Sequence, residues 1–265
     1  MARVKSILSV RGRIGDTVFV RRNGITIAGM SGGASRDKIL TAPEFINTRK
    51  NMAEFGACAS MAKSVYDNLS TPIFATVRKK TSMRQMIAEL RKIQQAYAGG
   101  TELNGERTVK LHEDLINFQF NEKNKFKSIY GGAFDSEISV GADSATITFE
   151  DVNPQSDMVI PAGATHFKLI AGIVGMSQSK YNAVSGAYDK PVIYGKAIQE
   201  SAFLEVSGTI VIPALITLMP GAPVIPPDGT SILTLGISFY KEVGGVKNKM
   251  FENDAMECVD TLTIV

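Results

Sequence analysis

Side chains that could do acid–base or metal chemistry are few and far apart in this chain. His112 and His166 are its only histidines, and Cys58 and Cys258 are its only cysteines. Neither pair has the spacing of a zinc site, and no G-x-S-x-G or cysteine-based signature places a nucleophile beside a histidine. We therefore expect solvated or core histidines, buried structural thiols, no cofactor, no metal and no enzyme activity.

Two further patterns approach known binding motifs but lack the deciding residues. Gly12-Arg13-Ile14-Gly15 is not followed by the Gly-Lys-Ser/Thr that a phosphate loop needs where it opens a helix. The acidic pairs Asp135/Glu137 and Glu150/Asp151 lack the spacing of a calcium-binding loop. We expect solvated carboxylates there.

Charge is divided unevenly along the sequence. Residues 1–100 hold 17 Lys/Arg and 6 Asp/Glu, residues 101–130 hold 5 of each, and residues 131–265 hold 7 and 15, although the whole chain carries only +3. Such a dipolar chain can stack on copies of itself or turn one end toward a polyanion. The candidate contacts for a polyanion or a protein partner are basic residues of the first part: Arg11, Arg13, Arg21, Arg22, Arg78, Lys79 and Lys80.

Turn-forming residues divide the first 40 residues into a β-hairpin and a connector. Asn23-Gly24 separates two β-prone runs, residues 17–20 and 25–28, and suits a type I′ turn because that turn needs positive φ at both central residues. Residues 30–36 contain Gly32-Gly33 and are typical of a flexible connector. We therefore expect a hairpin and connector over residues 1–40.

The next segment, residues 41–100, has the apolar period of two helices. Thr41-Ala42-Pro43-Glu44 predicts a capped helix start, and Ser70-Thr71-Pro72 predicts a short break between antiparallel helices that end at Gly99-Gly100. The predicted buried faces share helical spacing and comprise Phe45, Met52, Phe55, Ala59, Ala62, Tyr66 and Leu69, then Met83, Met86, Ile87, Leu90, Ile93 and Tyr97.

After a linker at residues 101–127, the pattern changes to that of short strands. Gly, Pro, Asp and Asn clusters separate the runs, and no helical period competes with them from residue 128 to residue 265. Candidate strands cover residues 136–140, 145–149, 166–174, 203–212, 232–240 and 259–265. The predicted fold class is α+β: an N-terminal β-hairpin, an antiparallel helical hairpin and a C-terminal antiparallel β-sandwich over residues 128–265.

The most apolar stretch is residues 206–225. Pro213, Pro220 and Pro223 interrupt it, which argues against a membrane helix and favours the end of a strand followed by a rigid loop at residues 213–227. The N-terminus has no long apolar run behind its charges, so we expect neither secretion by a signal peptide nor a membrane partner.

Both ends of the chain resemble a protein family of Bacteroidetes and crAss-like phages. Residues 12–24 are similar to the family's N-terminal G-[KR]-[IL]-G hairpin, and residues 235–246 to its closing F-[FY]-x-E-V-x-G strand. Lys241 and Gly244 depart from that strand, and at Thr41-Ala42-Pro43-Glu44 the proline of the family's helix start is displaced and its glutamines are missing. The resemblance implies a helical hairpin and a β-sandwich in a virion protein of the head–tail connector, and it supplies no catalytic residue.

Charge, chemistry and resemblance together favour a self-assembling structural protein of a phage virion, made in the host cytoplasm and placed as a ring in the connector or tail region. Its expected partners are copies of itself and other virion proteins. Two alternatives stay open. The basic half could contact duplex DNA non-specifically as the lining of a channel, or the sandwich could bind a surface or carbohydrate, as in a fibre or adhesin.

Overall fold

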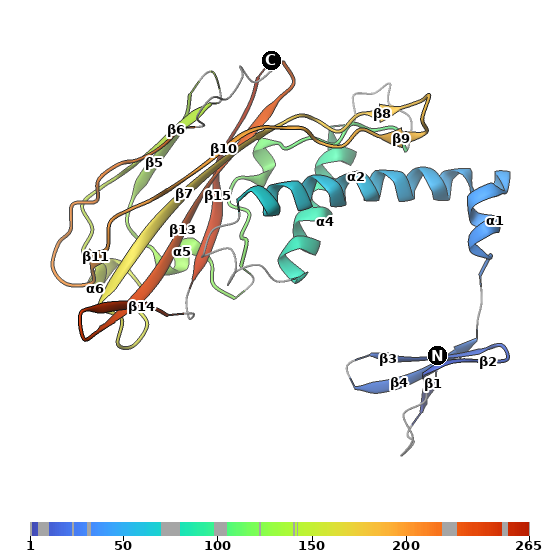
Figure 1. Ribbon diagram of the computed structural model, residues 1–265, viewed down its shortest axis with the longest axis horizontal. Coiled ribbons are helices and arrows are strands. Elements are labelled where there is room, and N and C mark those ends of the chain that lie inside the picture. The colour runs from blue at the N-terminus through green and yellow to red at the C-terminus, as the bar shows by residue number, and fades with distance from the viewer. Residues whose placement is uncertain are drawn as a thin grey trace. The chain divides into compact units, whose positions relative to one another are not determined.

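The computed structural model describes residues 2–4, 11–22, 24–30, 33–69, 80–97, 105–121, 123–139, 141, 143–218, 227–250 and 254–264. The chain divides into two compact units, Met1–Arg49 and Lys50–Val265 (Figure 1). The segments predicted at residues 101–127 and 128–265 therefore lie in the second unit. The same unit contains the long helix at residues 80–96 and all but the first four residues of the long helix at residues 46–68.

The first unit contains a four-stranded antiparallel sheet. Its strands are β1 (Ala2–Val4), β2 (Gly12–Ile14), β3 (Thr17–Arg22) and β4 (Ile25–Met30), in the order β1-β4-β3-β2. The predicted hairpin is confirmed. β3 pairs with β4 from Arg22 opposite Ile25 to Thr17 opposite Met30, and Gly24 in the connecting turn has a φ of 79°. Asn23 and residues 31–32 of the predicted connector lie outside the described residues.

The predicted helix start at Thr41 is wrong. Ser35 caps a short additional helix, α1 (Arg36–Thr41), by accepting a hydrogen bond from the Lys38 N–H, and Thr41 is the last residue of that helix. A 3₁₀ turn, η1 (Pro43–Phe45), then leads into α2 (Ile46–Asn68) without a side-chain cap. The capping pattern alone could not distinguish the end of one helix from the start of the next.

Two helices of the second unit contribute to one hydrophobic core. α2 buries Ala62 and Tyr66 as predicted, with Leu69 just beyond its end, whereas Met52 and Phe55 nearer its start are 56% and 51% exposed. α4 (Lys80–Ala96) buries Met86, Leu90 and Ile93 at helical spacing, as predicted. Of the other predicted residues, Met83 and Ile87 are half-buried, and Tyr97, just beyond the helix, is 46% exposed.

The remaining strands form antiparallel sheets, as predicted. The large sheet has the order β10 (Ile193–Glu200), β7 (His166–Met176), β13 (Thr230–Val243), β14 (Val246–Lys249), with β15 (Ala255–Thr263) also paired to β13 and β11 (Leu204–Glu205) to β7. The small sheet has the order β12 (Leu215–Leu218), β6 (Ser144–Phe149), β5 (Phe134–Ile138), and β8 (Tyr181–Asn182) pairs with β9 (Ala187–Tyr188).

Alternate residues of β7 face two different cores. Ile170 and Val174 pack with the helices, whereas Leu169 and Ile173 pack with residues of the small sheet such as Ile147. This period of two is what a strand with both faces covered requires. The second unit is therefore layered as helices, large sheet and small sheet (Figure 1), a mixed α+β fold.

Three strand predictions need correction. Only Leu204–Glu205 of the predicted strand at residues 203–212 is a strand. β12 lies inside the stretch predicted as a rigid proline loop, and β10 carries no predicted strand at all. β12 is an edge strand that begins two residues after Pro213, a position that proline tolerates because no ladder hydrogen bond is lost there.

Candidate functional site

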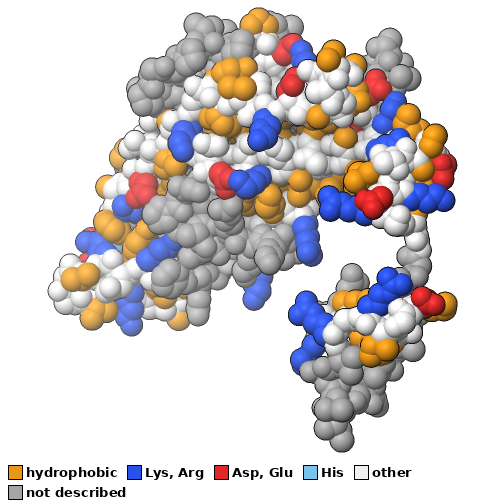
Figure 2. Space-filling view, turned by 45° about the vertical axis from the view of Figure 1, so that its right-hand side comes forward, with side chains coloured by type: hydrophobic (Ala, Val, Ile, Leu, Met, Phe, Trp, Pro, Cys, Tyr) orange, Lys and Arg blue, Asp and Glu red, His pale blue; other side chains and the backbone are white. Residues whose placement is uncertain are grey.

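The N-terminal sheet has no buried residue among the positions whose side chains the structure describes. Every residue of the first unit whose side chain is described, at positions 11–21, 24–30 and 33–49, is at least partly exposed. These residues include large apolar side chains: Ile14 is 64% exposed, Val20 45%, Ile25 42% and Met30 85%. Figure 2 shows hydrophobic and basic side chains together on the surface of this sheet. The first unit therefore has no hydrophobic core of its own within the described residues.

Strand register places apolar side chains on both faces of this sheet. Ile14, Thr17 and Met30 are cross-strand neighbours and share one face, which the next alternate position, Phe19, also joins. Val20 pairs with Ile27 on the opposite face. Antiparallel sheets that are solvated on one side normally alternate apolar and polar residues, so this pattern is typical of a sheet covered on both sides.

The structure brings some of the predicted basic contacts together. Arg11, Arg13 and Arg21 are exposed on or beside the N-terminal sheet, and the Arg22 backbone lies at the end of β3. The Arg13 guanidinium donates a 2.8 Å hydrogen bond to the Gly15 carbonyl and lies 3.7 Å from the Asp16 carboxylate.

The other basic contacts predicted from the sequence are not placed with this sheet. Lys80 begins α4 in the second unit, and its side chain lies outside the described residues, as does the Arg22 side chain. Arg78 and Lys79 lie wholly outside them.

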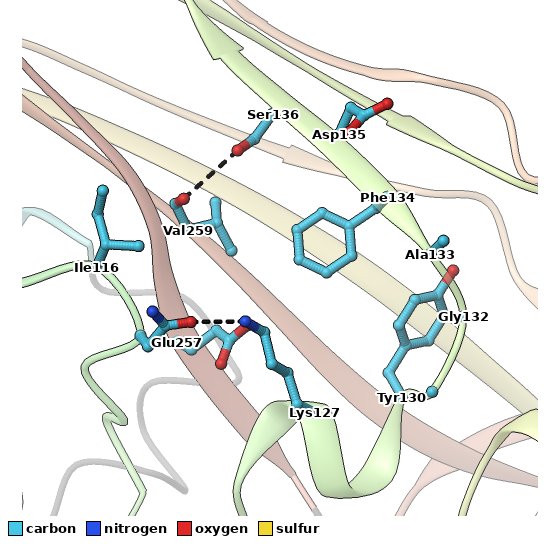
Figure 3. Close-up of a pocket in the computed structure, with 12 residues that line it drawn as sticks. Ile116, Lys127, Tyr130, Gly132, Ala133, Phe134, Asp135, Ser136, Glu257 and Val259 are labelled. Atoms are coloured by element: carbon cyan, nitrogen blue, oxygen red, sulfur yellow. Dashed lines mark hydrogen bonds between the residues drawn. The ribbon is translucent and has the colours of Figure 1, made fainter.

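A pocket of about 620 Å³ lies between the edges of β5 and β15 in the second unit. A short helix, α5 (Phe126–Ile129), borders it, and Phe134 points into it while Asp135 points away (Figure 3). The lining is Ile116, Asn117, Lys127, Tyr130, Gly131, Gly132, Ala133, Phe134, Asp135, Ser136, Glu257 and Val259. No motif in the sequence indicated this site; the Gly131-Gly132 pair before a short alternating run is the signal that could have marked it.

A buried carboxylate lies in the wall of this pocket. Glu257 is 1% exposed, and its Oε2 accepts a 2.6 Å hydrogen bond from Gln119 Nε2. Burial raises the pKa of Glu257, although the Gln119 hydrogen bond and the positive charge of Lys127 act in the opposite direction. Lys127 Nζ donates a 2.6 Å hydrogen bond to Asn117 Oδ1. The wall therefore combines a poorly solvated acid with one exposed ammonium group.

Two glycines allow the pocket rim to close over Tyr130. A Cβ on Gly132 would lie 2.9 Å from the Tyr130 hydroxyl, and a Cβ on Gly131 would lie 2.5 Å from the Asp157 carbonyl oxygen. The Tyr130 hydroxyl is buried and has no hydrogen-bond partner among the described residues, and burial raises its pKa to about 12. This hydroxyl stays protonated at neutral pH and serves as packing rather than as an acid–base group.

The free edge of β5 faces β15. The Ala133 carbonyl accepts a hydrogen bond from the Glu150 N–H on the β6 side. Because the backbone groups of successive strand residues point to opposite edges, those of Phe134 and Ser136 point away from β6. Ser136 Oγ donates a 3.4 Å hydrogen bond to the Val259 carbonyl there (Figure 3). The two edges thus approach each other at Ser136 and leave the pocket open on the Phe134 side.

The two histidines contact different parts of the second unit. The His112 ring stacks on Tyr97 with 3.9 Å between the ring centres, and its Nδ1 accepts from the Asp114 N–H. His166 Nδ1 is 2.9 Å from Thr165 Oγ1, and its Nε2 is 3.7 Å from the Glu242 carboxylate. The described residues contain no group of three or more His, Cys, Asp or Glu side chains that could hold a metal ion.

Comparison with known proteins finds no match to a protein-family model, to a curated protein or to a solved structure. Within the described part of the chain, no helix is both long and apolar enough to cross a membrane. The functional argument therefore depends on the two surfaces above: the N-terminal sheet and the pocket between β5 and β15.

Proposed function

We propose that this chain is a structural protein of a phage virion that assembles with copies of itself, forming a ring in the head–tail connector. The observation that carries the proposal is the N-terminal sheet, which has apolar side chains on both faces and no buried residue among the positions whose side chains are described. A sheet of this kind is stabilised when another molecule covers it.

Covering the sheet would supply part of the free energy needed for association. Fully burying a side chain such as Ile14 or Met30 stabilises by about 1.5 to 3 kcal/mol, and four apolar side chains of this sheet are more than two-fifths exposed. Association costs roughly 4 to 15 kcal/mol in lost translational and rotational freedom. Four such side chains offset the lower part of that range, so further contacts must contribute.

Opposite charges on the two units supply a second contribution. Met1–Arg49 contains nine Lys/Arg and three Asp/Glu, a net charge of +6, whereas Lys50–Val265 contains 20 and 23, a net charge of −3. A contact between the first unit of one copy and the second unit of the next is therefore attractive. A contact of this head-to-tail type closes into a ring when its rotation is suitable.

The oligomeric state of the full-length protein tests the proposal. Native mass spectrometry and light scattering are expected to find closed oligomers. The double variant Ile14→Asp/Met30→Asp is expected to be monomeric, because both aspartates place a charge on the same apolar face of the sheet. Val184→Asp is the matched control, since Val184 is fully exposed in the second unit.

The position of the protein in the particle needs its own measurement. Mass spectrometry of purified virions should detect the chain, and particle imaging should place it as a ring at the connector. A wild-type protein that stays monomeric at every concentration and is absent from purified virions would reject the proposal.

A second candidate function has one supporting observation, the exposed Arg11, Arg13 and Arg21 of the same sheet. In this version the assembled ring contacts duplex DNA that passes through it. Binding of DNA by the oligomer should then fall steeply as salt rises, because each phosphate contact releases counterions. Undetectable binding at low salt would remove this candidate.

A further inference from the structure

We propose that the N-terminal sheet of one copy packs face to face on the small sheet of a second copy and covers the side of the small sheet that is turned away from the pocket. This inference rests on the self-assembly proposed above and specifies the two surfaces that meet. Two sheets packed in this way lie about 10 Å apart, and their facing side chains interdigitate. The contact joins the first unit of one copy to the second unit of the next, so it is head to tail.

The outer face of the small sheet, meaning the side turned away from β7 and β13, is exposed. Side chains along a strand alternate between the two faces of a sheet, and Ile138, Ala145 and Ile147 are buried on the inner face against the large sheet. Figure 1 shows β5 and β6 on the side of β7 and β13 opposite the helices. The alternate positions point outward and are at least partly exposed: Asp135, Glu137, Thr146, Thr148 and Ile216.

Two acidic side chains form one edge of this outer face. Asp135 and Glu137 are two residues apart on the edge strand β5, so both carboxylates lie on the same face and repel each other. Their cross-strand neighbours are the uncharged Thr148 and Thr146, and neither acid has an ion-pair partner among the residues that the structure describes. Asp135 points away from the pocket (Figure 3). A partner that brings positive charge to this edge therefore relieves the repulsion.

The β2 edge of the N-terminal sheet carries the matching positive charge. Arg13 lies on the same face as Val18 and Val20, and Arg11 occupies the alternate position just before β2. The two arginines are therefore two residues apart, as the two acids are, which is about 7 Å along an extended strand. The pair between Arg13 and Asp16 is 61% and 85% exposed, so it is weak enough to be exchanged for a contact with another copy.

The two faces also match from edge to edge beyond their charges. The strands follow in the order β2, β3, β4 in one sheet and β5, β6, β12 in the other. In both, the charged edge strand is followed by two strands with β-branched side chains on the same face: Val18, Val20, Ile25 and Ile27 in the N-terminal sheet, and Thr146, Thr148 and Ile216 in the small sheet.

Stacking the two sheets covers apolar side chains that are exposed in each. Val20 is 45% exposed, Ile25 42% and Ile216 54%, and burial of such side chains favours association. The opposite face of the N-terminal sheet, with Ile14 and Met30, remains for the further contacts that a ring requires. Charge, spacing and residue type thus identify the occupant of the outer face as the N-terminal sheet of a second copy.

Charge reversals test the contact in the full-length protein. Arg11→Glu/Arg13→Glu and Asp135→Lys/Glu137→Lys should each weaken self-association by about tenfold or more in light scattering, because like charges then face each other. A chain that carries all four changes should recover association. Asp151→Lys/Glu205→Lys changes the charge equally at exposed positions elsewhere in the second unit and should leave association unchanged.

A mixture of the two defective variants shows whether the partner is a second copy. Each variant keeps one native edge, and the glutamates of one attract the lysines of the other, so an equimolar mixture should associate again with the two variants alternating. Native mass spectrometry identifies that composition. A misfolded variant could not restore association, and a contact within one chain would leave both variants defective in the mixture.

Two results would overturn this inference and leave self-assembly standing, provided that Ile14→Asp/Met30→Asp still abolishes association. One is that either charge-reversed variant associates like the wild type. The other is that both are defective and neither the mixture nor the four-change chain recovers. A wild type that never associates would instead reject the proposed function.

Discussion

Gln119 and Glu257 lie 138 positions apart in sequence and are joined by a 2.6 Å hydrogen bond. The same Gln119 side chain accepts a 2.9 Å hydrogen bond from the Phe126 N–H at the start of α5. The neighbouring backbone also pairs with β15, since the Phe120 N–H donates to Met256 and the Cys258 N–H donates to Phe118. One neutral amide thus holds a buried carboxylate and links β15 to the short helix beside the pocket.

The first prediction concerns the pH dependence of stability. Burial makes the Glu257 pKa higher in the folded than in the unfolded protein, so its ionisation opposes folding as pH rises through the folded pKa. Glu257→Gln cannot ionise and keeps an oxygen for Gln119. We expect its stability advantage over the wild type to grow from acidic to neutral pH in urea unfolding. The exposed Glu205→Gln is the control, and an advantage that is constant or shrinks with rising pH would contradict the argument.

The second prediction concerns the contact between Gly172 of β7 and the end of α2. A Cβ on Gly172 would lie 3.0 Å from Leu69 Cδ2 and 3.1 Å from Thr234 Oγ1. Gly172→Val should therefore destabilise the protein by about 1 to 3 kcal/mol through overpacking. Gly56→Ala is the control: its Cβ meets nothing within 4 Å, and alanine in a helix is favoured over glycine by about 0.5 to 1 kcal/mol. Equal effects of the two changes in chemical unfolding would refute the close packing.

The third prediction compares a buried and an exposed ion pair. Lys249 Nζ lies 3.0 Å from Asp254 Oδ2, and the two side chains are 15% and 3% exposed. Lys249→Met should cost about 3 kcal/mol or more, because it removes the cation that lies 3.0 Å from a buried carboxylate. Lys180→Met, which breaks a pair with Asp228 that is 58% and 60% exposed, should cost less than about 1 kcal/mol. Thermal unfolding of both variants measures the difference, and a mild effect of Lys249→Met would count against the buried pair.

The fourth prediction concerns the thiols. Cys58 is fully buried, and burial raises its pKa to about 11. Burial also raises the pKa of Cys258. Since the thiolate is the reactive form, iodoacetamide at pH 8 should label neither cysteine in the folded protein and both in denaturant, as mass spectrometry would show. Rapid labelling of folded Cys58 would indicate that the helical core opens.

Local patterns predicted those elements for which the spacing of apolar residues and the flanking turn residues indicate the same structure. Asn23-Gly24 marked its hairpin, and the helical spacing around Tyr66 and Leu90 marked the helical core. β7 and β13 could be recognised as apolar runs of strand length. In each of these cases the information lies within a dozen neighbouring residues.

A competing local signal and long-range contacts explain what the sequence patterns missed. Thr41 ends α1 because Ser35, six residues earlier, already caps a helix. β12 is a strand because Leu215 pairs with Ile147 across the small sheet, which the nearby prolines did not indicate. The pocket depends on β5 meeting β15 more than a hundred positions later, so the local signal at Gly131-Gly132 could mark its rim but could not predict its opposite wall.

Because β7 and β13 form a common wall between two cores, neither core can melt alone without exposing the apolar face of these strands to water. The second unit should therefore unfold in a single cooperative transition, and the amide hydrogens of these two strands should be the slowest to exchange with solvent. By contrast, amide exchange in the N-terminal sheet should slow only when something covers it.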